Sequence, residues 1–212
     1  MSDRDFDFEA QPGLPAPLPA GEELLWQGSP DAAILARDAY KIRWITGYMV
    51  LLALWRSGAA WADGGPRGAI ATLIPYLVLA LAAYGVIRVL AWAQARAAIY
   101  SISSARIILR IGAALPITYT IPFSCIEAAA LSSSTAGGTG TLAFATNGNI
   151  RLSWAVLWPH VRPWHFRVPQ PAFRAIPDAA RVGRIFADAA QAKLNEPRIN
   201  LASPAGTLVA AE

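Results

Sequence analysis

The apolar and charged positions divide this chain into an oily middle and more polar flanks. Residues 68–87 contain no charged side chain, and as a helix they would span about 30 Å, the hydrocarbon thickness of a bilayer. A second apolar run, 44–62, contains a single charge, Arg56. The residues between the two runs, 63–66, read Asp-Gly-Gly-Pro and are typical of a turn. The pattern therefore predicts a two-helix transmembrane hairpin over 44–93, with helices at 44–62 and 68–92.

Cations around these two runs predict which way the hairpin faces. Three cations, Arg37, Lys41 and Arg43, stand just before the first run. Arg56 lies inside that run and Arg67 follows the turn. Arg88 and Arg96 follow the second run. Cytoplasmic segments of membrane proteins carry an excess of Lys and Arg. We therefore expect a multi-pass protein with both termini in the cytoplasm.

Beyond Arg96 the hydrophobic period changes from helical to extended. Short β-branched runs separated by turn residues predict antiparallel strands, and Asn147-Gly148 indicates a tight hairpin. An amphipathic helix follows from Asp178 to about Leu194. A sheet of short strands closed by one C-terminal helix is the plan of a pleckstrin-homology-like (PH-like) antiparallel β-barrel, which we expect over 97–195. The predicted strands are 99–103, 106–111, 117–121, 125–131, 141–145 and 150–153.

The flanking segments have different compositions. Residues 1–20 combine four acids with four prolines and predict a disordered leader, and 196–212 predicts a disordered tail. Between the leader and the hairpin, 21–43 forms a juxtamembrane segment. Its first part is strand-like and ends in Gly-Ser-Pro, and a short helix is expected from Asp31, which would be the N-cap.

Composition and charge narrow the function. Hydrophobic residues make up 55% of the chain and charged residues 15%, which fits a small α+β membrane protein better than a soluble enzyme. No acid occurs from Ala128 to Pro177, whereas this segment contains four arginines. We expect anionic lipid headgroups or acidic protein surfaces as partners of such a segment. Nucleic acid is not expected, because no recognition motif accompanies the charge.

The sequence offers little catalytic chemistry. A single cysteine, Cys125, excludes an intrachain disulfide and a Cys-x-x-Cys motif, and it is expected to be a buried small residue. No nucleotide-binding loop, zinc motif or nucleophile elbow is present. His160 and His165 could be metal ligands, axial pigment ligands or ordinary interfacial residues, and no second ligand set accompanies them. We expect no enzyme activity, no cofactor and no metal.

The most informative polar stretch runs from 154 to 167. Aromatic anchors, histidines and arginines are concentrated there, with prolines that prevent regular structure. Such groups suit protein interfaces and lipid headgroup layers, although the tryptophans could instead fill the domain core. Arg56 could reach the membrane boundary or contact an acidic group or cofactor carbonyl on a partner helix. The candidate partner- or membrane-binding residues are Trp154, Trp158, His160, Arg162, Trp164, His165, Arg167 and Arg56.

Several short motifs resemble a known family. They are Gly21-Glu22-x-Leu24-x-Trp26-x-Gly28-x-Pro30, then Tyr100-Ser101-Ile102-Ser103-x-x-Arg106-Ile107-Ile108, then Ile121-Pro122-Phe123-x-x-Ile126. Together with the two intervening apolar runs, they resemble the bacterial pleckstrin-homology membrane proteins. Within that group, the leader 14–22 and the whole layout are similar to the photosynthetic-complex assembly proteins of purple bacteria.

This resemblance implies a function and a location. The implied function is a non-enzymatic assembly factor of the bacterial inner membrane that holds photosynthetic reaction-centre and light-harvesting subunits while their complex forms. Self-association into a homo-oligomer is left open. The alternative is a lipid-headgroup-sensing PH-like module without a photosynthetic partner.

Overall fold

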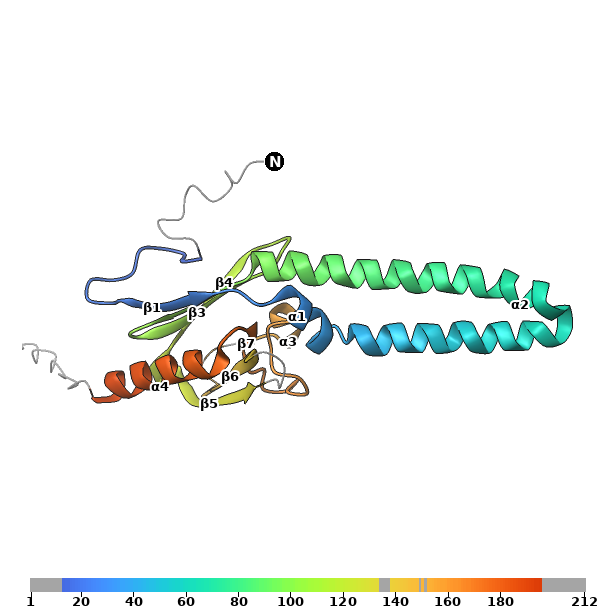
Figure 1. The fold of residues 1–212 in the computed structure, drawn as a ribbon. Helices are drawn as coiled ribbons and strands as arrows, with labels where there is room; N and C mark the ends of the chain where they lie inside the picture. The colour runs from blue at the N-terminus through green and yellow to red at the C-terminus, as the bar shows by residue number, and fades with distance from the viewer. Residues whose placement is uncertain (1–12, 134–137, 149, 151, 196–212) are drawn as a thin grey trace, which may run out of the picture.

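The computed structural model describes residues 13–133, 138–148, 150 and 152–195. Figure 1 shows a long helical element projecting from a domain that holds all the strands, which we call the β domain. In chain order the elements are β1 Leu24–Gly28, α1 Ala32–Asp38, α2 Ile42–Ala97, β2 Ile99–Ser103, β3 Arg106–Ile111, β4 Ile117–Pro122, the 3-10 turn η2 Phe123–Cys125, β5 Ile126–Ser133, β6 Gly140–Thr146, α3 Trp154–Leu157, β7 Ala172–Ile176 and α4 Ala179–Asn195.

The long element α2 reverses direction within the turn expected from the sequence. Gly65 has φ 59° and ψ −154°, a conformation that a residue with a Cβ rarely adopts, and it separates two helical arms. The arms lie side by side (Figure 1), since Ser57 Oγ donates to the Ala69 carbonyl at 3.0 Å and Ile42 clusters with Ala91. The length and hydropathy of α2 are sufficient to cross a membrane, and only 6% of its most apolar window is buried.

The strands form two antiparallel sheets, β1-β2-β3-β4 and β5-β6-β7. The expectation of antiparallel PH-like strands is confirmed, but the expectation of a closed barrel is wrong. Within the described part of the chain, no ladder joins β4 to β5 or β7 to β1. Pro122 ends β4 because it has no N–H to donate, and η2 then turns the chain before β5 starts. The two sheets therefore remain open along the β4 and β5 edges.

Aromatic side chains fill the core between the sheets and α4. The ring of Phe173 stacks on Tyr100 at 4.7 Å and meets Phe144 edge-on at 5.0 Å, and Phe144 in turn contacts Phe186 of α4 at 5.0 Å. Gly140 permits the close packing at the base of α4, since a Cβ there would lie 2.7 Å from the Cβ of Ala179, the first residue of α4. The helix expected near Asp178 is confirmed as α4, with Phe186 and its neighbours on the buried face.

Three local expectations are corrected by the structure. Ile150, Leu152 and Ser153 form no strand, because the chain after β6 leads into α3 instead of returning as a hairpin. Besides β5, β6 pairs with β7, a strand that the sequence analysis did not predict. Leu194, a hydrophobic residue at the end of the expected amphipathic helix, is 77% exposed because the helix extends past the end of the core.

The segment before the hairpin packs on the β domain. Strand β1 pairs with β2, and α1 starts where expected, with the Asp31 carboxylate accepting the Ile34 N–H at 2.8 Å. Leu14, inside the expected leader, is buried, while residues 1–12 lie outside the described residues. Glu22 forms a 2.8 Å ion pair with Arg106 at the start of β3. The juxtamembrane segment is therefore an integral part of the β domain. The expected tail, 196–212, also lies outside the described residues.

Candidate functional site

The aromatic and basic stretch forms a loop with a fixed base. Val161 pairs with Pro171 in an isolated antiparallel bridge. Just inside that bridge, the Arg162 N–H donates to the Gln170 carbonyl at 2.9 Å, and the Arg162 guanidinium donates to the Gln170 side chain at 3.0 Å. We call residues 162–170 the aromatic loop. Arg162 is thereby committed to holding the two ends of this loop together.

The tip of the aromatic loop is apolar and exposed. Trp164 is 85% exposed, Phe166 55% and Val168 56%. The Phe166 ring lies between Trp164, at 6.3 Å, and Trp154, at 4.8 Å, and Trp154 also packs on the core. Because apolar side chains gathered at one exposed tip favour transfer out of water, this loop is a candidate contact surface.

The remaining predicted residues of the stretch frame this tip. Arg167 is exposed next to it, and half-buried His165 has its Nδ1 2.8 Å from the Pro163 carbonyl. Trp158 is 38% exposed and meets Tyr40 edge-on at 4.9 Å, just before α2 begins. Figure 1 shows this segment, in orange, on the side of the β domain from which the hairpin projects. The aromatic loop therefore lies beside the base of the hairpin.

A buried hydrogen-bond cluster holds the loop from inside. His160 is completely buried, and its Nδ1 lies 2.5 Å from the Tyr100 hydroxyl. That hydroxyl oxygen also accepts the Arg174 backbone N–H at 3.4 Å. The Arg174 guanidinium, 7% exposed, donates to the Pro159 carbonyl at 3.3 Å. Strands β2 and β7 are thus bonded to the residues that lead into the aromatic loop.

Burial sets the protonation states of this cluster. Desolvation, with a smaller effect from the nearby Arg174 charge, lowers the pKa of His160 to about 3. Burial likewise raises the pKa of the Tyr100 hydroxyl and lowers the pKa of the Arg174 guanidinium. His160 is therefore neutral at ordinary pH, and its Nε2 is buried without a hydrogen-bond partner among the described residues.

The cluster is buried and supports the aromatic loop from inside the β domain. His160 therefore contributes to the exposed surface only by holding the loop in place. In the described part of the chain, no group of three His, Cys, Asp or Glu side chains could hold a metal ion. Cys125 is partly buried against the core. We therefore treat the aromatic loop as the candidate site and the His160 cluster as its support.

The structure separates some residues that the sequence grouped by charge. Arg56 is exposed midway along the first arm of α2 and is not part of the loop surface. Of the four arginines in the acid-free segment, Arg174 is buried, Arg151 lies outside the described residues, and Arg162 bonds to Gln170. Arg167 is the exposed cation closest in sequence to the loop tip.

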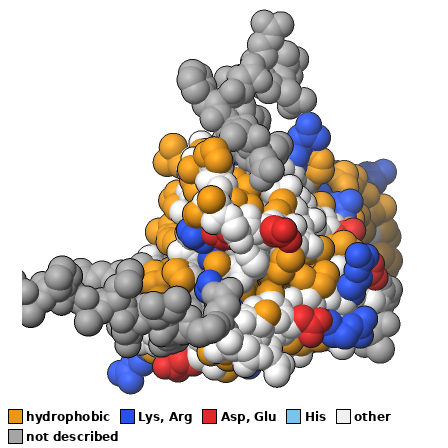
Figure 2. Space-filling model, turned by 90° about the vertical axis from the view of Figure 1, so that its left-hand side faces the viewer, with side chains coloured by type: hydrophobic (Ala, Val, Ile, Leu, Met, Phe, Trp, Pro, Cys, Tyr) orange, Lys and Arg blue, Asp and Glu red, His pale blue; other side chains and the backbone are white. Residues whose placement is uncertain are grey.

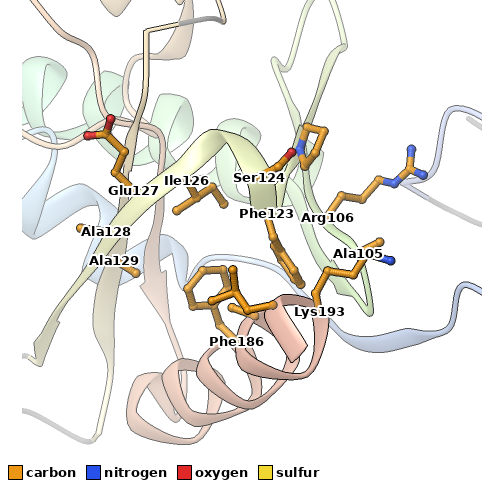
Figure 3. Close-up of a pocket in the computed structure, with 13 residues that line it drawn as sticks. Ala105, Arg106, Phe123, Ser124, Ile126, Glu127, Ala128, Ala129, Phe186 and Lys193 are labelled. Carbon is orange, nitrogen blue, oxygen red and sulfur yellow. The ribbon is translucent and has the colours of Figure 1, made fainter. Parts of the chain in front are cut away.

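The opposite side of the β domain carries a groove. It has a volume of about 760 Å³ and runs between β5, η2 and the C-terminal half of α4. Figure 3 shows Phe123 and Phe186 pointing toward each other in it, with their ring centroids 5.4 Å apart. Figure 2 views the face away from the hairpin, where hydrophobic, acidic and basic side chains are interspersed. The visible part of that face is therefore not a uniformly basic surface.

Sequence reasoning missed two features around the site. One is β7 with its buried Arg174, although the apolar run 172–176 between two prolines is a strand signal. The other is the partner of His160, because the bond to Tyr100 joins residues far apart in the chain. Such a long-range pair cannot be read from a single sequence.

Comparison with known proteins agrees with this architecture. The family model described as "Bacterial PH domain" matches residues 42–190, which include both arms of the hairpin and most of the β domain. A Rhodobacter capsulatus protein, "Uncharacterized 23.7 kDa protein in puhA 5'region", is 58% identical over 211 residues, which cover 99% of each chain.

A solved structure gives a much weaker likeness. It is a DUF1696 family protein with a pleckstrin-homology domain from Shewanella loihica, with 11% identity and a TM-score of 0.29, covering 44% of this chain and 71% of that one. This likeness is too slight to support any argument. The family match over most of the chain is sufficient by itself: this protein belongs to the bacterial PH domain family.

Proposed function

We propose that this protein is a non-enzymatic assembly factor of the PuhB type, which holds photosynthetic reaction-centre and light-harvesting subunits during complex formation. The observation that carries the proposal is the long, exposed apolar hairpin with an aromatic loop beside its base. The relative named for its place in the puhA 5' region supports the choice of partner. The protein would bind its partners without transforming them, and would need no cofactor.

The hairpin has the dimensions of a bilayer-spanning element. Ile42 packs against Ile87 and Ala91, which places Arg43 and Arg88 at about the same level on the two arms. From that level to Asp63 at the tip, the first arm rises about 30 Å, the thickness of a hydrocarbon core. The distance from the arginines at the base to the tip of the hairpin thus equals the thickness of the hydrocarbon core, which supports two membrane-spanning arms.

The charges at the two ends of the hairpin support one orientation. Lys41, Arg43, Arg88 and Arg96 lie at the base, whereas the tip carries Arg67 and the acidic Asp63. Under the positive-inside rule, the base and the β domain face the cytoplasm of the bacterial inner membrane. Both ends of the described chain belong to the β domain, so both termini would be cytoplasmic.

In this orientation the aromatic loop would meet the headgroup layer. Trp164 and Phe166 would insert among the headgroups, and Arg167 beside them would attract anionic lipids. Hairpin and loop together would fix the β domain against the membrane. The domain would then present one defined face to membrane-embedded partners.

Arg56 provides a second contact inside the bilayer. It lies about seven residues before Asp63, so it would sit roughly 10 Å below the far surface of the hydrocarbon layer. The structure leaves it exposed on the arm, and an arginine at that depth is costly unless it reaches the surface or finds an acceptor. A partner helix with a carboxylate or carbonyl at the same depth would supply that acceptor. Packing and such polar contacts select helices inside a membrane.

Photocrosslinking in native membranes tests the proposal. A photoreactive residue at Trp164 or Arg56 should capture reaction-centre or light-harvesting subunits in cells that are building complexes. The same residue at Asp188, exposed on α4, is the control and should capture none. We expect only substoichiometric amounts of the protein in purified mature complexes. Fixed stoichiometry in mature complexes would contradict a transient role.

The exposed loop also favours a second function, that of a lipid-sensing module without a photosynthetic partner. The two functions differ in what holds the protein in place. If crosslinks from Trp164 reach only lipids, and binding to vesicles depends on anionic lipid, then the sensor is correct and the assembly factor is not.

A further inference from the structure

The groove on the β domain follows an open sheet edge. In the three-stranded sheet, β5 pairs with β6 on one side, and within the described ranges no strand pairs with its other side. All residues of β5 after Ile126 are exposed. Every second residue of an edge strand directs its N–H and C=O groups outward, where an added strand can pair with them. From Ala128 to Ser133 this edge carries neither a charge nor a proline, two of the devices that keep sheet edges from pairing.

The groove opens where α4 leaves β5. Near the start of α4 the two elements lie close together, because a Cβ on Gly183 would be 3.4 Å from the Leu131 side chain. At its other end α4 forms a wall of the groove, where Leu194 is 77% exposed. Phe123 and Phe186 form an apolar floor between β5 and α4 (Figure 3). A strand added to β5 would therefore place every second side chain over an apolar floor.

One end of the groove is basic. Arg106 and Lys193 both lie at that end, and the Glu127 carboxylate points away from them (Figure 3). Arg106 donates from Nη2 to Glu22 at 2.8 Å, and a guanidinium can bond to more than one carboxylate because it has five N–H donors. This end of the groove therefore favours an acidic group on whatever binds there.

The direction of β5 determines which end of an added strand would meet these cations. Strand β5 begins beside Arg106, since η2 precedes it and the Phe123 N–H donates to the Ala105 carbonyl at 3.1 Å. The described strand pairings of the β domain are antiparallel. A strand added to β5 in the same manner would have its C-terminal end where β5 begins. The acidic group would therefore belong at the C-terminal end of the added strand.

We propose that the groove binds an extended segment of a partner protein as an additional antiparallel strand on β5. The segment would carry apolar side chains two positions apart, which would cover Phe123 and Phe186. An acidic residue would follow toward its C-terminal end, near Arg106 and Lys193. This inference goes beyond the proposed function, because it specifies the chemistry of a bound segment and does not depend on which protein carries it.

Two other occupants fit the groove less well. A second copy that added its own β5 about a two-fold axis would bring Ser132 or Ser133, and no acid, to the basic end. A bilayer would lie on the hairpin side of the β domain, whereas α4 ends on the side away from the hairpin (Figure 1). The open strand edge and the basic end together favour a peptide from a partner.

Selection from a displayed library of random nonapeptides on the detergent-solubilised full chain tests the inference. Enriched peptides should share apolar residues two positions apart, followed by Asp or Glu toward the C-terminal end. At saturation, a synthetic copy of the most enriched peptide should slow hydrogen exchange of the β5 amides by about tenfold or more. Exchange of β4, the other open edge, should stay unchanged. Because the library is random, failure of the proposed assembly function would not alter this result.

Matched variants locate the bound peptide, with its affinity measured by fluorescence anisotropy. Lys193→Glu should weaken binding by about tenfold or more, whereas Arg181→Glu, exposed near the start of α4, should not. Leu194→Asp should also weaken binding, whereas Leu115→Asp, at a position 78% exposed and outside the groove, should not.

Several results would overturn the inference. One is the absence of any peptide enriched over an empty support. Others are equal binding to all four variants, or protection of β4 in place of β5. Protection of β5 that rises with protein concentration when no peptide is present would also overturn it, because a second copy would then occupy the groove.

Discussion

The burial of His160 makes the stability of the β domain depend on pH in a defined direction. His160 is neutral in the fold, with a pKa lowered to about 3, whereas a histidine in an unfolded chain has a pKa near 6.5. A group whose pKa is depressed by folding contributes stability above its unfolded pKa. That contribution is lost as pH falls below about 6.5 toward 3.

The size of this loss follows from the two pKa values. Between pH 8 and pH 5, the unfolded chain takes up a proton at this position and the folded chain does not. Linkage then gives a decrease of about 2 kcal/mol in the free energy of unfolding at pH 5. The charge of the buried Arg174 is part of this cost, because it contributes to the lowered pKa of His160.

Denaturant unfolding of the full chain in detergent, followed by tryptophan fluorescence, measures this effect. His160→Asn keeps a short acceptor for the Tyr100 hydroxyl but cannot titrate, so it should lose about 2 kcal/mol less than the original chain between pH 8 and pH 5. His165→Gln changes the other imidazole, whose Nδ1 lies 2.8 Å from the Pro163 carbonyl and not beside Tyr100, and is the matched control variant. If His160→Asn lost as much stability on acidification as the original chain, the assignment of a buried neutral His160 would be refuted.

Three further predictions follow from the packing. Phe173→Ala removes a fully buried ring that stacks on Tyr100, and should lower the free energy of unfolding by about 3–5 kcal/mol in the same denaturant assay. Asp31→Ala removes the carboxylate that caps α1, and should cost about 1 kcal/mol, whereas Asp31→Asn should cost much less. Trp164→Ala changes an exposed side chain, so stability should stay within about 0.5 kcal/mol, while photocrosslinking from position 167 to anionic lipid in reconstituted vesicles falls; unchanged crosslinking would contradict a headgroup contact.

Most of the secondary structure could be predicted because its signals are local. The β-branched runs 99–103 and 106–111 appear as strands with those bounds, and Asp31 caps a helix as its position indicates. The reversal of α2 falls at Gly65, inside an Asp-Gly-Gly-Pro turn that only a glycine-rich sequence accommodates. Periodicity and turn chemistry therefore sufficed wherever neighbouring residues determine the conformation.

The errors concern pairings between distant parts of the chain. Asn147-Gly148 indicated a local hairpin, yet β6 pairs with β7, because the chain after β6 leads into α3 instead of returning along β6. The barrel was expected to close, but closure depends on the edges of β4 and β5 meeting, and local patterns do not encode that contact. The aromatic stretch was located correctly as a segment, whereas its division into an exposed tip and a buried His160 base required the fold.

The central claim is that the hairpin crosses the membrane with the β domain on the cytoplasmic side. A Cys125→Ser background with one new cysteine, Gly64→Cys at the tip or Asp178→Cys on the β domain, allows labelling of intact spheroplasts with a membrane-impermeant maleimide. The account predicts that Gly64→Cys is labelled before lysis and Asp178→Cys only afterwards. The reverse pattern, or labelling of both sites in a protein that stays in the supernatant after lysis, would contradict it.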